Sequence, residues 1–419
     1  MNAPVSIVPT RRSLSIESTR RLLLPALCGS LLVIAPAASR AEEVKPIHRS
    51  FEVRETAGIR RHFDVVTATL PLPDSAAATT RFQLLRSGEP MTAQFRINGA
   101  ERIPTLVTDF VDHFAPLETQ RYTLVIHAED TVEEPAPGLM LRTASDNFYI
   151  NSAGVVDWTI PRDLKGLLQF SYQNRKYVRD DSVGLFFEDD SGKTHQLSER
   201  TPHSATVERD GPIASSLRFD YADWPPGAKS SVQLEFYRTK SWIHVVWTIA
   251  GAADRLRSIG VGLNLLIEGP EVLVDFGAGD FVYTTAREGQ TTRLQAEPRS
   301  EDRIDWSVLH GTEGSLVPIV VAPQQKTAVP VPGWAHVMGE HRCTALALAE
   351  FGESSSDQIA VDGNGRLTCM REFPAESEAD VRTRSLEFWL HFVTMPVHIG
   401  ARTSARSMQE PLEVVWDEE

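Results

Sequence analysis

Cysteine is scarce in this chain of 419 residues, which contains only Cys28, Cys343 and Cys369. No Cys-x-x-Cys pair is formed, and the Gly-x-Ser-x-Gly, His-Glu-x-x-His and phosphate-loop motifs are also missing. Their absence removes the usual signatures of redox dithiols, serine hydrolases, zinc proteases and nucleotide hydrolases. The sequence therefore indicates a class of ligand better than a reaction, and it identifies no catalytic residue.

The chain also lacks the 3.6-residue periodicity of long helices and any repeat of solenoid or propeller length. Short runs rich in β-branched and aromatic residues recur instead, separated by Gly, Pro or charged residues. The clearest runs are residues 213–221, 231–237, 242–250 and 259–267. Asp362-Gly363-Asn364-Gly365 is a strong hairpin signal. We predict an all-β protein containing a large antiparallel β-sandwich.

One break divides the predicted strands into two groups. Residues 129–138 combine acidic residues with Pro and Gly, which is typical of a linker. Before it, residues 44–135 contain five or six short alternating strands and fit a small β-barrel. After it, residues 138–419 contain longer strands and form the predicted β-sandwich.

Long apolar runs are absent except near the N-terminus. Residues 22–36 form an apolar stretch that is shorter than the ~20 residues needed to span a bilayer, so no transmembrane segment is predicted. Arg11-Arg12 and Arg20-Arg21 precede this stretch, and small residues at 37–41 follow it. This order predicts a signal peptide over residues 1–41 and export to the periplasm or the exterior, by the general or the twin-arginine route.

The net charge is strongly negative. It is −14 for the whole chain and becomes −18 without residues 1–41, which contain five Arg and one Glu. Such a surface repels nucleic acid and anionic lipid, so we expect no nucleic-acid partner. A local basic run could neutralise an acidic polysaccharide, or could be ordinary solvated charge; it consists of Arg162, Lys165, Arg175, Lys176 and Arg179.

Two predicted strands carry aromatic and planar polar side chains on one face. The period of two places Trp242 beside His244 on one strand, and Glu387, Trp389 and His391 together on another. Aromatic faces can cover the apolar side of a sugar ring while polar groups bind its hydroxyls. We predict these five residues as a carbohydrate-binding site. An outer sheet face with hydrogen-bonded histidines explains the same pattern.

Two further patterns have two interpretations each. In residues 274–281, Asp275 and Asp280 flank a glycine-rich turn that could bind sugar hydroxyls or Ca²⁺, or simply join two strands. Two carboxylates are a weak metal signal, so no metal or cofactor is predicted. Cys343 and Cys369 could form a disulfide or remain buried thiols.

Several strand and turn sequences indicate a family. They are residues 70–73, 81–84, 90–95, 109–110, 117–124 and 207–212. In these the chain resembles the exo-acting rhamnogalacturonan lyase and YetA-like proteins. The resemblance implies a small barrel of RIFT type followed by a β-sandwich, and a connection to carbohydrate. Full-length members continue into an α/α-toroid domain, whereas this sequence is β-like up to residue 419, so the resemblance implies no catalytic residue here.

We therefore predict an exported carbohydrate-associated protein that binds polysaccharide without cleaving it. One alternative is a polysaccharide lyase, in which Tyr or His removes the proton α to a uronate and Arg or Lys stabilises the enolate. Another is an envelope protein whose sandwich packs on a protein partner. A deep cleft containing His, Tyr and Arg favours the lyase, a shallow aromatic strip favours binding, and an exposed apolar patch favours the partner.

Export has a direct test. N-terminal sequencing of the protein purified from its native cell should give Glu42 as the first residue, because the small residues at 37–41 fit a cleavage site. A native protein that begins at Met1 or Asn2 would contradict the prediction.

Overall fold

The computed structural model describes most of the chain beyond residue 44. The described residues are 45–72, 80–98, 104–127, 138–154, 156–251, 255–279, 281–300, 303–322, 331–373, 383–395 and 401–417. The predicted signal peptide, 1–41, and nearly all of the predicted linker, 129–138, lie outside them. Residues 45–419 form one compact unit. Among the described residues, no helix has the length and apolar character needed to cross a membrane.

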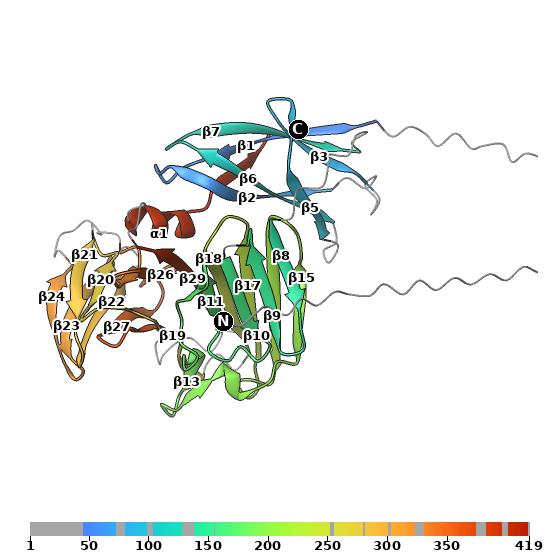
Figure 1. The fold of residues 1–419 in the computed structure, drawn as a ribbon. Helices are drawn as coiled ribbons and strands as arrows, with labels where there is room; N and C mark the ends of the chain where they lie inside the picture. Colours follow the sequence, from blue (N-terminus) through green and yellow to red (C-terminus); the bar gives the residue numbers. More distant parts are fainter. Residues whose placement is uncertain are drawn as a thin grey trace, which may run out of the picture. The chain divides into compact units, whose positions relative to one another are not determined.

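The all-β prediction is confirmed. The described residues form five antiparallel sheets together with one α-helix, α1 (Ala401–Gln409) (Figure 1). Alternation along single strands explains their burial. In β18 (Trp242–Ala250) every second side chain is buried, including Ile243, Val245 and Trp247, and the side chains between them are half-buried. This is the pattern of a strand with one face in the core.

Two of the sheets form the N-terminal part. One has the order β30–β1–β7–β3–β4 and the other β2–β6–β5. Their strands are β1 (Ile47–Arg54), β2 (Arg61–Pro71), β3 (Phe82–Arg86), β4 (Glu89–Met91), β5 (Ala93–Asn98), β6 (Thr105–Phe114), β7 (Thr119–Ile126) and β30 (Glu413–Trp416). Phe51, Phe110 and Tyr122 are part of the core that the two sheets share.

The predicted barrel is not closed. Within the described residues no ladder joins the two N-terminal sheets, which pack as layers over their aromatic core. Edge strand β4 has only three residues, so it offers little backbone for a closing ladder. The C-terminal strand β30 pairs with β1 and places Trp416 4.5 Å from Phe51, measured between ring centroids. The last strand of the chain thus completes an N-terminal sheet.

The remaining sheets form the large sandwich. The nine-stranded sheet consists, in spatial order, of β15 (Ser204–Arg209), β16 (Ala214–Ala222), β17 (Lys229–Tyr237), β18, β29 (Thr383–Thr394), β26 (Arg342–Leu348), β25 (Trp334–Met338), β20 (Val272–Phe276) and β21 (Val282–Ala286). The eight-stranded sheet consists of β14 (Thr194–Gln196), β13 (Gly184–Asp189), β19 (Leu256–Asn264), β28 (Arg366–Glu372), β27 (Ser356–Asp362), β22 (Gln290–Ser300), β23 (Arg303–Thr312) and β24 (Ser315–Val321).

A five-stranded sheet adds to the same hydrophobic core. Its order is β12 (Arg175–Lys176), β11 (Gln169–Tyr172), β10 (Val156–Pro161), β9 (Asn147–Ser152) and β8 (Leu139–Thr143). Trp158 of β10 lies against Phe236 of β17 and Phe392 of β29, with ring centroids 5.6 and 5.7 Å away. The core is therefore continuous between this sheet and the nine-stranded sheet.

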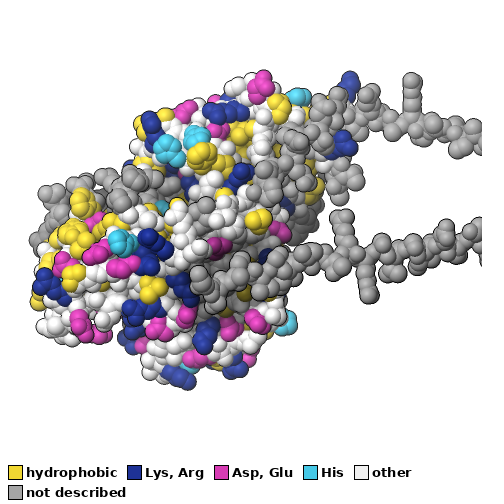
Figure 2. All heavy atoms as spheres, in the orientation of Figure 1, with side chains coloured by type: hydrophobic (Ala, Val, Ile, Leu, Met, Phe, Trp, Pro, Cys, Tyr) yellow, Lys and Arg dark blue, Asp and Glu magenta, His cyan; other side chains and the backbone are white. Residues whose placement is uncertain are grey.

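Apolar side chains are exposed on edge strands of the sandwich. Val317, Ile319 and Val321 of β24 are about half exposed, and Tyr283 of β21 is also exposed. Hydrophobic side chains gather at the end of the sandwich where β21 and β24 lie (Figure 2). Pro318 lies within β24 and has no N–H to donate, which limits the pairing of this edge with another strand.

Of the two alternatives for the cysteines, buried thiols are observed and the disulfide is not formed. Cys343 and Cys369 are buried free thiols on β26 and β28, which belong to different sheets. The hairpin over residues 362–365 is confirmed, since the Gly365 N–H donates to the Asp362 carbonyl at 3.0 Å. However, this hairpin joins β27 to β28 within the eight-stranded sheet, so it does not bring Cys369 to β26. Burial raises the pKa of Cys343 to about 12, which keeps the thiol protonated.

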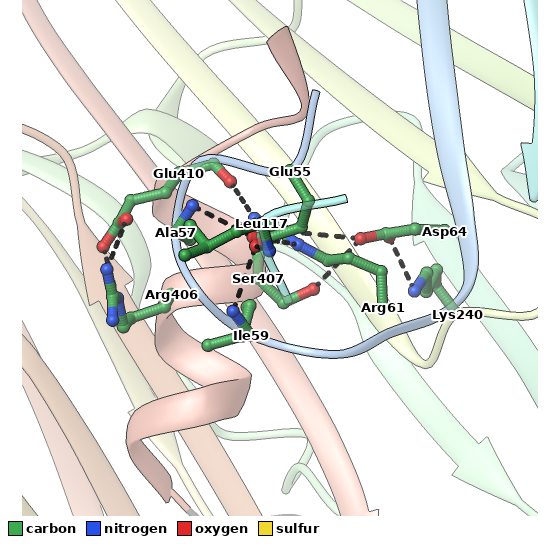
Figure 3. Close-up of polar contacts among 10 residues, drawn as sticks. All are labelled: Glu55, Ala57, Ile59, Arg61, Asp64, Leu117, Lys240, Arg406, Ser407 and Glu410. Carbon is green, nitrogen blue, oxygen red and sulfur yellow. Dashed lines mark hydrogen bonds and ion pairs between the residues drawn. The ribbon is translucent and has the colours of Figure 1, made fainter. Parts of the chain in front are cut away.

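One buried guanidinium joins the N-terminal part to helix α1 (Figure 3). Arg61 of β2 is almost fully buried and forms ion pairs with Glu55 and Asp64 at 3.3 Å. It also donates to the carbonyl oxygens of Ser407 at 3.1 Å and Glu410 at 2.6 Å, at the C-terminal end of α1. Late helical carbonyls lack partners within the helix, so Arg61 caps α1.

Replacement of Arg61 by Leu should lower the free energy of unfolding by roughly 3–5 kcal/mol, because Glu55 would remain buried without its cation. Arg54→Leu is the matched control. Arg54 also pairs with a glutamate, but its side chain is 42% exposed, so a change of at most about 0.5 kcal/mol is expected. Urea denaturation measures both. Equal effects of the two variants would contradict the role given to Arg61.

Candidate functional site

A row of side chains crosses the outer face of the nine-stranded sheet. Residues directly opposite each other in an antiparallel ladder share a face. The registers of neighbouring strands connect, in order, Arg209, Ser216, Glu235, His244, Trp389, Ala347 and Trp334. The predicted residues His244 and Trp389 are thus cross-strand neighbours on the face that points away from the sandwich core.

Helix α1 covers part of this face. Its residues Ala405 and Met408 pack in one cluster with Trp334, Ala345 and Ala347 of the sheet. The two alanines of β26 are small, which lets the helix lie close to the strands. The helix therefore covers the β25–β26 end of the row and adjoins the end that contains His244.

A cavity of about 680 Å³ lies at that open end. It is lined by residues from β2, β15, β17, β18 and β29, from the turn after β26, and from α1 and the segment after it. The polar and aromatic residues among them are Arg61, Asp64, Thr67, Arg209, Glu235, Tyr237, Trp242, His244, Glu350, Glu353, Glu387, Trp389, Ser407 and Gln409. Four of the five predicted site residues line it: Trp242, His244, Glu387 and Trp389.

His244 is held on three sides. Its Nδ1 lies 3.0 Å from Oε2 of Glu235, and its Nε2 lies 2.9 Å from Oε1 of Glu387. Its ring stacks on the indole of Trp389, with centroids 4.7 Å apart and an interplanar angle of 9°. Because both carboxylates accept hydrogen bonds, both ring nitrogens act as donors and the imidazole is charged. A protonated ring over an indole face adds a cation–π contact.

Protonation at the site follows from this geometry. Burial alone would lower the pKa of His244, but the hydrogen bonds to Glu235 and Glu387 outweigh burial and raise the pKa to about 9. Burial acts to raise the pKa of Glu235, yet the hydrogen bonds from His244 and Tyr237 lower it to about 2. The Tyr237 hydroxyl donates to Glu235 at 2.6 Å, and burial beside that carboxylate raises the pKa of Tyr237 well above its ordinary value.

The network continues into the N-terminal part. Arg209 forms ion pairs with Glu235 at 3.4 Å and with Asp109 of β6 at 3.2 Å. The Thr67 hydroxyl of β2 donates to the same Asp109 at 2.7 Å. Lys240, between β17 and β18, pairs with Asp64 of β2 at 2.7 Å. Ion pairs thus connect both parts of the chain around the cavity.

His391 lies elsewhere. It pairs with Trp242 and Ala345 in the ladders and lies beneath α1, where Nδ1 is 2.7 Å from the Ser404 hydroxyl. It lines a smaller cavity of about 170 Å³. Burial beneath the helix lowers its pKa to about 3, so the ring is neutral. His391 is therefore a hydrogen-bonded histidine of the outer sheet face, which is the alternative explanation of the sequence pattern.

Sequence reasoning missed much of the lining. Glu235 and Tyr237 lie on a strand that was predicted, and alternation places them together on one face, so pairing that strand with 242–250 could have found them. Arg61 and Asp64 meet residues 407 and 410, more than three hundred positions later in the chain, and no local pattern indicates this. Glu350 and Glu353 lie in the turn after β26 and had no signal of their own.

Within the described residues, the other sequence patterns do not reach the cavity. Asp275 lies half-buried on β20, opposite His336, and Asp280 is outside the described residues. Across the described part of the chain, no group of three His, Cys, Asp or Glu side chains is arranged to hold a metal ion. In the basic run, Arg175 and Lys176 form the exposed edge strand β12, and Arg162 packs over the Phe148 ring.

Comparisons with known proteins identify the fold. Neither a protein-family model nor a curated protein sequence matches this chain. Among solved structures, it is similar to an α-mannosidase from Enterococcus faecalis V583, with a TM-score of 0.56 and 10% identity, over 88% of this chain and 46% of that one. A glycosyl hydrolase family 38 protein from Enterococcus faecalis gives a TM-score of 0.52 and 11% identity, over 88% and 47%. The chain spans about half the length of these proteins, and at this identity the likeness concerns the fold alone.

The protonation of His244 can be measured. In ¹⁵N NMR titrations both ring nitrogens should stay protonated through neutral pH, and the ring should lose a proton near pH 9. Glu387→Gln should lower this pKa because it removes a charged acceptor. Glu413→Gln, which changes an exposed glutamate of β30, should leave it unchanged. A His244 that titrates below pH 7 in the unmodified protein would contradict the geometry.

The same shifts set a pH window for stability. The raised pKa of His244 contributes stability that is complete below about pH 6.5 and is lost as the pH rises through about 9. The lowered pKa of Glu235 contributes stability that is complete above about pH 4.5 and is lost as the pH falls towards 2. Both contributions are complete only between about pH 4.5 and 6.5.

Proposed function

We propose that the cavity is a carbohydrate-binding site and that the protein binds glycan chains without cleaving them. The arrangement of Trp389, His244 and Glu387 carries this proposal. It supplies an aromatic surface and fixed polar groups side by side, which is what sugar binding requires. The volume of about 680 Å³ falls within the ~300–1,000 Å³ of small-molecule sites.

The lining offers both donors and acceptors for sugar hydroxyls. Carboxylates of Glu350, Glu353 and Glu387 can accept hydroxyl hydrogen bonds. The indole N–H of Trp242 is buried at the cavity and has no acceptor among the described residues. A buried donor without a partner costs free energy, so a ligand oxygen at this position would be favoured.

The cavity contains the His, Tyr and Arg side chains expected of a lyase, namely His244, Tyr237 and Arg209. Their protonation states weaken this alternative. A lyase base must take a proton from carbon, but His244 is already protonated and both of its nitrogens donate to carboxylates. Tyr237 donates to Glu235, and its raised pKa keeps the hydroxyl protonated. Neither candidate is available as a base at neutral pH. The resemblance to rhamnogalacturonan lyases and the predicted export point to an extracellular glycan as the ligand.

Trp389→Ala should weaken glycan binding by about 1–3 kcal/mol, the contribution of one buried aromatic contact. Trp389→Phe should give a smaller loss because a flat ring remains. Tyr283→Ala is the matched control, since it removes an exposed aromatic residue from the same sheet outside the cavity. Affinity electrophoresis on a glycan panel measures all three, with circular dichroism to check folding.

Two results would contradict this function. The first is that the unmodified protein binds none of the panel. The second is that the protein, incubated with rhamnogalacturonan, releases product with the ultraviolet absorbance of a 4,5-unsaturated uronide, which would assign lyase activity.

A further inference from the structure

We infer, resting on the proposed carbohydrate site, that the cavity selects neutral sugars and rejects uronates. Every cationic side chain that lines the cavity already pairs with protein groups, whereas some of the lining carboxylates form no ion pair with the described residues. The sequence resemblance implies acidic, galacturonate-containing chains, so the charge distribution gives a different ligand class from the one that the resemblance suggests.

The Arg61 guanidinium has no capacity for a ligand. It is almost fully buried and already donates to Glu55, Asp64 and two main-chain carbonyl oxygens. Freeing it for a sugar carboxylate would leave Glu55 buried without its cation, which is costly. Lys240 is likewise engaged, by Asp64 at 2.7 Å.

Arg209 and His244 are occupied in the same way. Arg209 lies between Asp109 and Glu235, and its side chain is 9% exposed. His244 uses both ring nitrogens on Glu235 and Glu387. A uronate approaching the cavity therefore meets cations whose charge is already balanced by protein carboxylates.

The unbalanced charges are negative. Glu350 and Glu353 are exposed at the cavity and form no ion pair with the described residues. Glu387 uses Oε1 on His244, so its other oxygen is available. With His244 protonated, the lining holds three cations, Arg61, Arg209 and His244. Its five carboxylates are Asp64, Glu235, Glu350, Glu353 and Glu387.

This excess of negative charge distinguishes neutral sugars from uronates. A neutral hydroxyl donates to a carboxylate in a charge-assisted hydrogen bond. A uronate carboxylate cannot donate, is repelled by the same oxygens and loses its hydration on entry. The repulsion acts across water at the cavity mouth, so it weakens with salt.

The test uses pairs of oligosaccharides that differ only at C6. Calorimetry compares galacto-, gluco- and manno-configured oligomers with their C6-oxidised, uronate forms, at low and high salt. We expect a neutral member to bind at least about tenfold more tightly than its acidic partner, and high salt to narrow the gap. Tighter binding of an acidic member would overturn this inference and leave the carbohydrate site standing. Binding of neither member of any pair would overturn both.

A double variant locates the selectivity. Glu350→Gln with Glu353→Gln should reduce the preference for the neutral member roughly three- to tenfold, by improving binding of the acidic member. Binding of the neutral member by the same variant shows that the fold is intact. Glu313→Gln, an exposed glutamate in the turn between β23 and β24, should leave the preference unchanged. An unchanged preference in the double variant would contradict the role of these two glutamates.

Discussion

The buried guanidinium of Arg61 is the constraint on which the cavity depends. It neutralises Glu55 and Asp64, and it caps the C-terminal end of helix α1 through two main-chain carbonyl oxygens. Strand β2 forms one wall of the cavity and α1 with the segment after it forms another, so one side chain sets the distance between them. The final strand β30 then pairs with β1 and keeps this end of the chain in the N-terminal sheet.

The second constraint is charge balance on the outer face of the nine-stranded sheet. Asp109 of β6 and Arg209, Glu235, His244 and Glu387 of the nine-stranded sheet form a chain of ion pairs that alternates in sign. Each internal member has two partners, which fixes the side chains in one arrangement and explains the opposite pKa shifts of His244 and Glu235. A rigid network of this kind suits a binding surface, because little side-chain entropy is lost when a ligand arrives. It suits proton transfer poorly, because both ring nitrogens of His244 are engaged by carboxylates.

The alternation of buried and outward-facing side chains along single strands is what the sequence could predict. The period of two in β18 and β29 was enough to place Trp242 and His244, and Glu387 and Trp389, on a common outer face. Alternation also placed His391 on this outer face, but it could not show that α1 covers that position. The nine residues of α1 are mostly polar or small and give a helix little sequence signal. Alternation could predict neither the contacts of Arg61 nor that the two N-terminal sheets do not close into a barrel. Both depend on contacts between distant segments, and the returning strand β30 has no local signature that links it to β1.

The most direct test of the account is to locate a bound neutral oligosaccharide by NMR. The chain contains eight tryptophans, and each has one indole N–H signal. We expect the signals of Trp242 and Trp389 to shift on titration with a neutral oligosaccharide, since both line the cavity. The signals of Trp158 and Trp247, which are buried in the sandwich core, should stay in place. Shifts that spare Trp242 and Trp389, or no shifts at saturating sugar, would contradict the assignment of the cavity as a carbohydrate site.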